Sequence, residues 1–168
     1  MTKPIANLDE VEFTDIEANG FYTSKRAQFS AAIGAKQLGY NLTELAPGCA
    51  QCPFHSHRCE EEMFLILDGE GELRYGKDTY RIKKHDVIAC PTGGPETAHQ
   101  IINTGSVPLR YLSLSTMADV EVCEYPDSDK VGVYAGGGDA PRLRKLVRSE
   151  SGVDYYDRES TEPRRQKT

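Results

Sequence analysis

Two histidines and three glutamates lie close together in the stretch PFHSHRCEEEMFLILDGEG, residues 53–71. The glutamates are followed by the apolar run MFLIL and then by a glycine-containing end. Successive side chains of an extended segment point to opposite faces, so His55 and His57 point to the same face. Two imidazoles on one face can hold a divalent metal ion, because imidazole suits zinc, iron and nickel. A carboxylate from the start of the following strand would extend this ligand set.

A third imidazole can come from His99, which lies in TAHQIIN (97–103), a predicted strand after a Gly/Pro-rich turn. Three histidines and one glutamate leave open positions on a metal that prefers five or six ligands. The fourth histidine, His85, precedes Asp86 at a predicted turn, and we expect it to be exposed.

The cysteines offer a different metal site. Cys49 and Cys52 form a C-x-x-C directly before the histidines, so a structural zinc ion held by both thiols, Cys59 and a histidine is an alternative. The second ligand pair at the usual distance is missing, and HSH lacks the H-x3-5-H spacing of a zinc finger. Small, reduced cysteines are the simpler interpretation of all five thiols, which are Cys49, Cys52, Cys59, Cys90 and Cys123.

The elements that must position these residues are short strands separated by turns rich in Gly, Pro, Asn and Asp. We predict strands at 39–45, 62–68, 71–75, 79–82, 86–90, 97–103 and 109–115. Their even spacing, with no helical pattern between them, indicates an antiparallel sandwich or small barrel. Only KRAQFSAAIGAKQ (25–37) is compatible with a short helix.

This pattern resembles the two sequence motifs of the cupin superfamily. The first motif, G-x5-H-x-H-x3,4-E-x6-G, is matched by His55, His57, Glu62 and Gly69. The second, G-x5-P-x-G-x2-H-x3-N, is matched by Pro91, Gly93, His99 and Asn103. There are three departures: Gly48 lies one residue too far from the first histidine, His85 stands where a glycine is usual, and three extra residues precede His99.

The resemblance implies an all-β fold, the cupin-type double-stranded β-helix or jelly-roll barrel, with one divalent metal ion (Zn, Fe, Mn or Ni) at its centre. The implied metal ligands are His55, His57, Glu62 and His99. The motif spacing selects Glu62 among three consecutive glutamates. Glu61 fits only the shorter spacing and remains a second candidate, and we expect Glu60 to be solvated.

The predicted domain organisation is one barrel at 38–117, with an N-terminal extension (1–37) packed on it and a C-terminal extension or tail (118–168). A chain of 168 residues suits one domain. Phe64 and Ile66 share a face with Glu62 and are expected to line the barrel. The segment VEFTDI could add to the sheet edge of a second copy, so we predict a homodimer.

The net charge of −6 disfavours a nucleic-acid partner. From residue 140 onward eight Lys/Arg face five Asp/Glu, which interleave, so a solvated and partly ordered tail is expected there. No apolar run approaches the roughly 20 residues of a membrane helix. The start, MTKPIANLDEVEF, lacks the apolar stretch of a secretory signal, so we expect a cytoplasmic protein.

Within the cupins, QLGYNLTELAPG and GGPETAHQIINTGSVPLRYLSLST are similar to bacterial sugar-phosphate (mannose-6-phosphate) isomerase-like proteins. This implies a metal-dependent isomerase of a small sugar phosphate or hydroxy-carbonyl compound, in which Glu61 or Tyr111 moves the proton. A non-catalytic small-ligand sensor and an iron-dependent dioxygenase are the alternatives, because fold alone does not select a reaction. No basic residue is placed by motif for the phosphate, and the candidates are Arg58, Arg74, Lys83 and Arg110.

Overall fold

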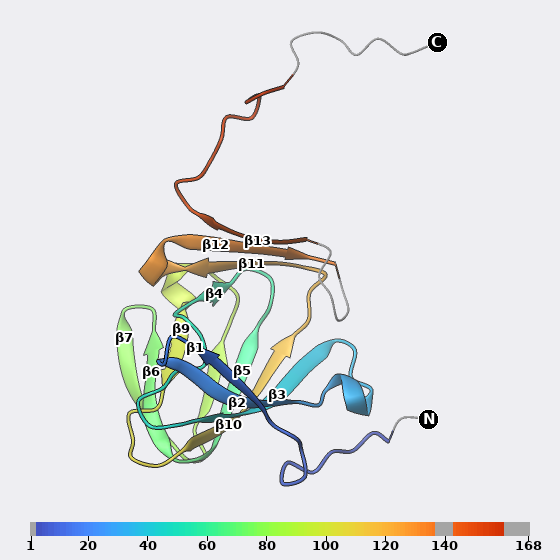
Figure 1. Cartoon of the computed structure of the whole chain (residues 1–168), viewed down its shortest axis with the longest axis vertical. Helices are drawn as coiled ribbons and strands as arrows, with labels where there is room; N and C mark the ends of the chain where they lie inside the picture. The colour runs from blue at the N-terminus through green and yellow to red at the C-terminus, as the bar shows by residue number, and fades with distance from the viewer. Residues whose placement is uncertain (1–2, 137–142, 160–168) are drawn as a thin grey trace.

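The protein is almost entirely β-structure in a computed structural model that describes residues 3–136 and 143–159 (Figure 1). The first strands are β1 (Thr14–Ala18), β2 (Tyr22–Gln28), β3 (Leu38–Leu45), β4 (Ser56–His57), β5 (Glu62–Asp68), β6 (Glu70–Tyr75) and β7 (Asp78–Lys83). They are followed by β8 (Val87–Cys90), β9 (His99–Ile102), β10 (Leu109–Thr116), β11 (Val120–Tyr125), β12 (Lys130–Ala135) and β13 (Leu143–Arg148). Helical structure in the described residues is limited to 3-10 turns at Ala31–Ile33, Pro95–Thr97 and Pro126–Ser128. The predicted all-β jelly-roll fold is confirmed.

Two antiparallel sheets form the barrel. The larger has the strand order β1-β2-β3-β10-β5-β8, and the smaller has the order β7-β6-β9. Alternation along β5 turns Phe64 and Ile66 inward, 6% and 0% exposed, as predicted. The core of the barrel is made by the buried side chains of Leu45, Phe64, Ile66, Leu73, Ile82, Ile88, Cys90, Ile101, Leu109 and Tyr111.

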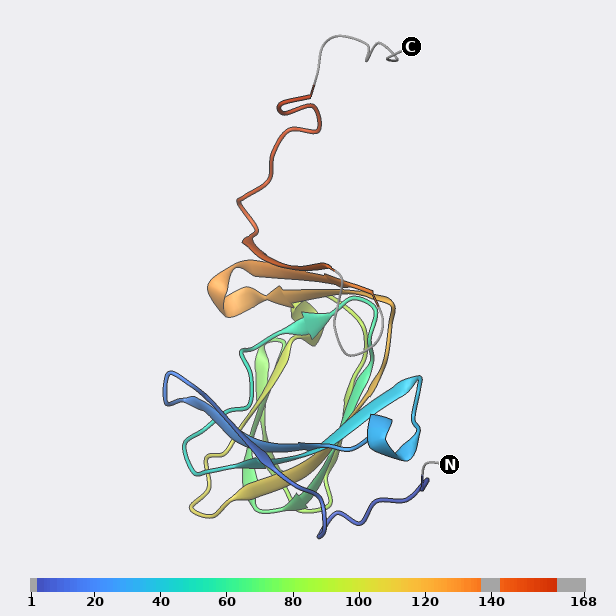
Figure 2. The same cartoon turned by 45° about the vertical axis from the view of Figure 1, so that its right-hand side comes forward.

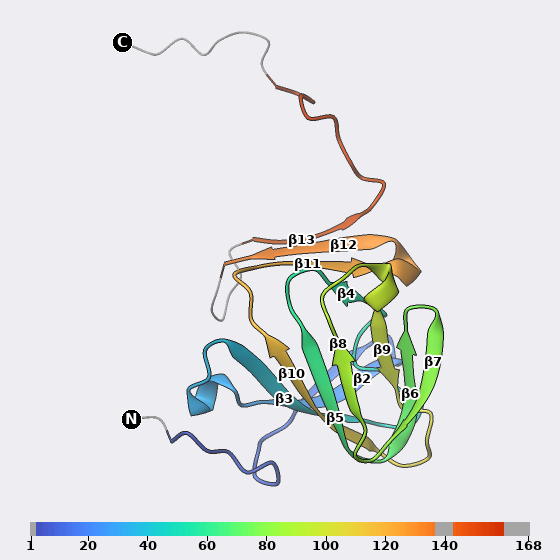
Figure 3. The same cartoon turned by 180° about the vertical axis from the view of Figure 1, so that it is seen from behind.

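A further sheet, with the order β13-β12-β11-β4, lies across one end of the barrel (Figures 1 and 3). Its strand β4 is the two-residue segment that contains His57, and Cys123 of β11 pairs with His57. Figure 2 shows this sheet from a second direction, with residues 149–159 after β13 leading away from the barrel. The C-terminal segment is therefore paired directly to a strand that carries a predicted metal ligand.

The seven predicted strands are all present, with ends within two residues of those expected. The short helix expected within 25–37 is present only as a 3-10 turn at Ala31–Ile33. Lys25–Gln28 belongs to β2, where Ala27 pairs with Leu42 of β3 and is 1% exposed, and only Ala31–Ile33 turns as a 3-10 helix. Burial against β3 outweighs the local helix propensity of this alanine-rich segment.

The two flanking segments contain strands that the sequence did not indicate. Part of VEFTDI belongs to β1, which pairs with β2 of the same chain and is exposed along its length. In the expected tail, Leu143–Arg148 forms β13 against β12; residues 137–142 and 160–168 of the C-terminal extension lie outside the described residues. The domain division and the homodimer stay predictions. Among the residues that the structure describes, no helix is long and apolar enough to span a membrane.

Two motif positions lie at turns with positive φ, and they differ in whether a side chain fits. Gly69 follows β5 with φ +81°, and a Cβ there would lie 2.5 Å from the carbonyl oxygen of Pro108, so only glycine fits. His85, which replaces the usual glycine of the second motif, adopts φ +75° at an exposed turn. Its side chain is exposed, as predicted, and its backbone takes the left-handed conformation that the turn requires.

Candidate metal centre

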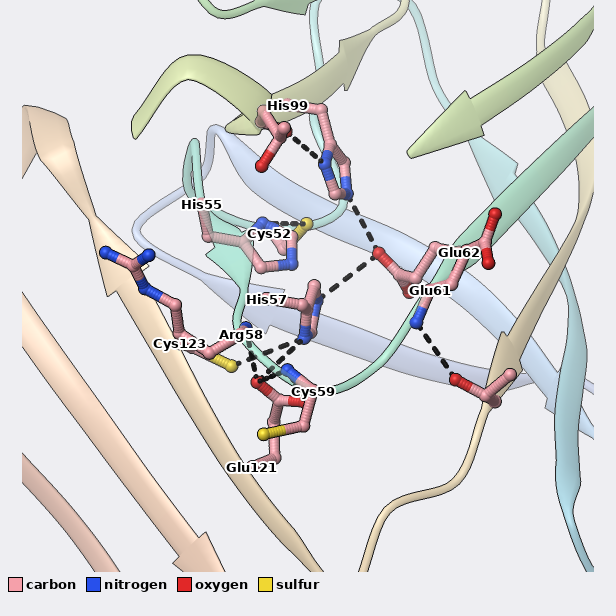
Figure 4. Close-up of polar contacts among 12 residues, drawn as sticks. Cys52, His55, His57, Arg58, Cys59, Glu61, Glu62, His99, Glu121 and Cys123 are labelled. Carbon is pink, nitrogen blue, oxygen red and sulfur yellow. Dashed lines mark hydrogen bonds and ion pairs between the residues drawn. The ribbon is translucent and has the colours of Figure 1, made fainter. Parts of the chain in front are cut away.

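Three separate segments bring the four predicted metal ligands together (Figure 4). His57 lies in β4 and His55 directly before it, while Glu62 begins β5 and His99 begins β9. One potential ligand atom from each residue lies within 4.8 Å of the others. His99 is 3% exposed, and the other three are half-buried.

Backbone pairing holds two of these histidines side by side. The amide of His99 donates to the carbonyl oxygen of His55 at 2.7 Å, and the amide of His55 donates back to the carbonyl oxygen of His99 at 3.2 Å. Their ring centroids are 4.9 Å apart. The relative position of these two imidazoles is therefore set by main-chain hydrogen bonds between strands, not by flexible side chains.

One carboxylate oxygen serves two histidines. Glu62 Oε2 lies 2.8 Å from His99 Nε2 and 3.3 Å from His57 Nε2. Burial favours a raised pKa for Glu62, but hydrogen bonds and charges from His57 and His99 outweigh it and lower the pKa well below its usual range. Burial favours a lower pKa for His57, but contacts with Cys123 and Glu62 raise it to about 9. The metal-free cluster is thus ionic, with a proton on His57.

The buried nitrogen of His57 fits a metal ion. His57 Nε2 faces the other two imidazoles, and its contact with Glu62 Oε2, at 3.3 Å, is longer than the 2.8 Å contact that His99 makes with the same oxygen. A cation at the centre of the cluster would give this buried nitrogen a closer partner. Three nitrogen donors and one carboxylate suit zinc, iron, manganese or nickel.

The opposite edge of the His57 ring contacts β11, a strand that the sequence did not indicate. His57 Nδ1 lies 3.5 Å from Cys123 Sγ and 3.8 Å from Glu121 Oε1. Glu121 is 5% exposed, and its carboxylate accepts hydrogen bonds from the amides of Arg58 and Cys59 at 2.9 and 3.2 Å. These groups turn Nδ1 toward β11 and leave Nε2 for the metal. In the sequence, Glu121 and Cys123 stand two positions apart in VEVCEY (120–125), and this alternation is the pattern from which a polar strand face could have been predicted.

A cavity of about 180 Å³ adjoins the cluster. Besides the four candidate ligands it is lined by Arg26, Gln51, Cys52, Phe64, Gln100, Ile101 and Tyr111. The hydroxyl of Tyr111 donates to Gln51 Oε1 at 2.5 Å. Tyr111 is 1% exposed, and this burial raises its pKa well above the ordinary value, so the phenol stays protonated.

The other two glutamates lie outside the cluster. Glu61 is exposed and does not line the cavity; its backbone amide donates to Thr116 Oγ1 at 2.9 Å. Glu60, expected to be solvated, is instead half-buried and accepts a hydrogen bond from the amide of Ala118 at 2.9 Å. Glu60 therefore supports the connection between β10 and β11, and burial raises its pKa.

The thiols of the alternative zinc site do not converge. Cys49 Sγ contacts the carbonyl oxygens of Gly20 and Pro47 at 3.9 Å, and Cys59 is exposed. Cys52 Sγ lies 3.8 Å from His55 Nδ1 and borders the cavity, where burial raises its pKa to about 12. In the described parts of the chain, the cysteine-containing group with metal-ligand geometry is the β11 group of His57, Glu121 and Cys123.

The family model of the cupin domain matches residues 41–115. An uncharacterised protein of Methanocaldococcus jannaschii is 34% identical over 96 residues, which cover 54% of this chain and 72% of that protein. The chain is a cupin. This cupin is also 31% identical to auxin-binding protein 1 of Arabidopsis thaliana over 105 residues, 58% of this chain and 52% of the relative, so it spans about half of that relative's length.

Two solved structures resemble the cupin over nearly its whole length. A sugar phosphate isomerase of the cupin superfamily from Silicibacter pomeroyi has a TM-score of 0.75 at 23% identity, covering 92% of this chain and 98% of that one. A protein from Acidithiobacillus ferrooxidans, whose name proposes a sugar phosphate isomerase, has a TM-score of 0.75 at 24% identity, covering 90% of this chain and 96% of that one. The likeness concerns the fold, and it extends beyond the matched barrel into the flanking strands of this cupin.

Proposed function

We propose that this cupin is a metal-dependent isomerase of a small sugar phosphate or related hydroxy-carbonyl compound. One observation carries the proposal: three imidazoles and one carboxylate converge within 4.8 Å of one another beside a cavity. The names of the two structural relatives support the substrate class.

A divalent metal held by His55, His57, Glu62 and His99 supplies a Lewis acid for the oxygens of the substrate. The chain supplies the groups around it. Glu62 faces the histidines with Oε2, and its Oε1 accepts no hydrogen bond within the described chain; the low pKa of this carboxylate keeps it ionised beside the histidines. Tyr111 stays protonated, so it can donate a hydrogen bond to a substrate oxygen but does not remove a proton.

Deuterium exchange tests this proposal directly. Protein reconstituted with zinc, manganese, nickel or anaerobic ferrous iron is incubated in D2O with dihydroxyacetone phosphate, glyceraldehyde 3-phosphate, mannose 6-phosphate and fructose 6-phosphate. Proton NMR should show metal-dependent loss of the signal from the carbon next to the carbonyl, followed by the isomeric product. The activity should disappear in His99→Ala and persist in His85→Ala, whose exposed side chain lies outside the site.

The second candidate is a non-catalytic sensor of a small ligand, and one observation favours it. Apart from the proposed metal ligands, the ionisable side chains that line the cavity and could act as bases are Cys52 and Tyr111, and burial raises the pKa of both. Neither accepts a proton at neutral pH. Binding of a compound without exchange of its protons would favour the sensor, and iron-dependent oxygen consumption would favour the dioxygenase.

A further inference from the structure

Arg26 on β2 is a cation at the candidate metal centre that belongs to the N-terminal segment. Its backbone pairs with Thr43 of β3, and its half-buried side chain lines the same cavity as the four candidate ligands. Arg26 Nη2 donates to the carbonyl oxygen of Gln51 at 3.0 Å. Its Nε is buried and has no partner in the described chain. The guanidinium is thus anchored on one side and free on another.

The arginines that the sequence suggested for an anion are otherwise engaged. Arg58 pairs with Glu124, Arg74 lies 2.7 Å from Asp127, and Arg110 lies 3.6 Å from Asp9. Arg26 forms no such ion pair within residues 3–136 and 143–159. A partly buried guanidinium without a counter-charge is unfavourable, and it is the residue type best suited to bind carboxylate or phosphate oxygens.

The charges around the cavity point the same way. Among the residues that line the cavity, Arg26 is the basic side chain besides the histidines, and Glu62 is the acidic one. With a divalent ion bound, one carboxylate would face an ion of charge two and a guanidinium.

We propose that Arg26 binds the anionic group of the substrate, a short-chain hydroxy- or oxo-compound bearing a carboxylate or phosphate, whose other oxygens face the metal ligands. The proposal rests on the metal site of the proposed function and adds the substrate's charge and size. The cavity volume of about 180 Å³ is close to that of roughly six water molecules, which suits a compound of few carbons. Nε and the remaining guanidinium hydrogens can bind two oxygens of one anion.

The test compares charged probes with neutral analogues of nearly the same size. Zinc-loaded protein is titrated by calorimetry with lactate against lactamide, and with dihydroxyacetone phosphate against dihydroxyacetone. The wild type should bind one anionic probe at least about tenfold more tightly than its neutral analogue. A preference in the first pair identifies a carboxylate, and one in the second pair identifies a phosphate.

Arg26→Gln should reduce that preference to about onefold while the zinc content stays unchanged. Arg26→Lys keeps the charge without the planar fork, so it should retain part of the preference. It also separates loss of anion binding from loss of folding, should Arg26→Gln fail to fold. Arg110→Gln is the matched control, because Arg110 also has a buried, unpartnered Nε but pairs with Asp9 and does not line the cavity.

The proposal is overturned if folded Arg26→Gln keeps the preference, if Arg110→Gln loses it equally, or if the wild type does not prefer an anionic probe. Because binding is measured without turnover, a preference lost in Arg26→Gln supports the subsite even where the deuterium experiment finds no isomerase. Proton exchange with no anion preference would have the opposite meaning: the isomerase would stand and the Arg26 subsite would not.

Discussion

The metal ligands and the groups that surround them come from different parts of the chain. His55, His57, Glu62 and His99 lie within the segment that matches the cupin domain, whereas Arg26 and the pair Glu121 and Cys123 lie on strands outside it. The four ligand candidates come from β4 and the residue before it, β5 and β9, which belong to three different sheets. The surrounding groups reach the site through pairing of β2 with β3 and of β11 with β4. In this cupin, the segment that matches the cupin domain provides the candidate metal ligands, and the flanking strands provide charged and polar groups around them.

The largest expected effect is loss of the metal from a ligand variant. His99→Ala should lower the metal content, measured by mass spectrometry of protein purified without chelator, from about one ion per chain to near zero. The apolar barrel core should keep the circular dichroism spectrum unchanged. Loss of metal in a Cys49→Ser/Cys52→Ser variant, with His99→Ala still loaded, would reverse the assignment in favour of the thiols.

The next effect measures what β11 contributes. Glu121→Gln removes the charge beside His57 Nδ1 but keeps an oxygen for the amides of Arg58 and Cys59. We expect metal affinity, measured by competition with a chelator, to fall about 10- to 100-fold. Glu124→Gln, on the same strand and paired with Arg58, is the control and should leave the affinity within about twofold. Equal losses in both variants would mean that β11 acts only by packing.

The affinity for metal should also depend on pH in a defined direction. In the metal-free protein the pKa of His57 is raised to about 9, so at lower pH a proton occupies the position that the metal needs. Affinity should rise by up to about tenfold per pH unit as the pH increases toward 9, with release of about one proton per metal. Calorimetry in buffers of different ionisation enthalpy measures this proton. A constant affinity from about pH 7 to 9 would contradict the ionic state of the cluster.

The smallest effect concerns a cavity residue that belongs to the barrel. Tyr111→Phe removes the hydroxyl that donates to Gln51 Oε1 and leaves a ring of nearly the same size in the core. Unfolding by urea should show a loss of about 1 kcal/mol. The metal content should not change, because Tyr111 is outside the candidate ligand set. A loss of metal would mean that Tyr111 supports the ligands. The supporting groups would then come from the barrel as well as from the flanking strands.

The sequence predicted those features that depend on the two-residue period of a strand or on the spacing of a motif. Side-chain alternation predicted that His55 and His57 share a face, and motif spacing separated Glu62 from Glu61, which the structure leaves exposed. The inward orientation of Phe64 and Ile66 followed from the same two-residue period.

The flanking groups could not be predicted in this way. Arg26 lies in a segment whose composition suits a helix, and its position depends on pairing with β3. The candidates Arg58, Arg74 and Arg110 are engaged by acids distant in sequence, and such pairs leave no local pattern. The contact of Cys123 with His57 spans 66 positions of the chain. Long-range strand pairing decided each of these cases.

The pairing of β4 with β11 also sets an order of events during synthesis. β4 has two residues, and its partner in the sheet is β11, so His57 leaves the ribosome well before Cys123 can meet it. Contacts at such separation form late in folding. We therefore expect the apolar barrel to form first and the metal to enter an almost finished protein, in contrast to zinc fingers, whose folding requires the ion. On the proposed metal site, cells short of metal would then hold a folded cupin without its ion, able to bind the ion when it returns.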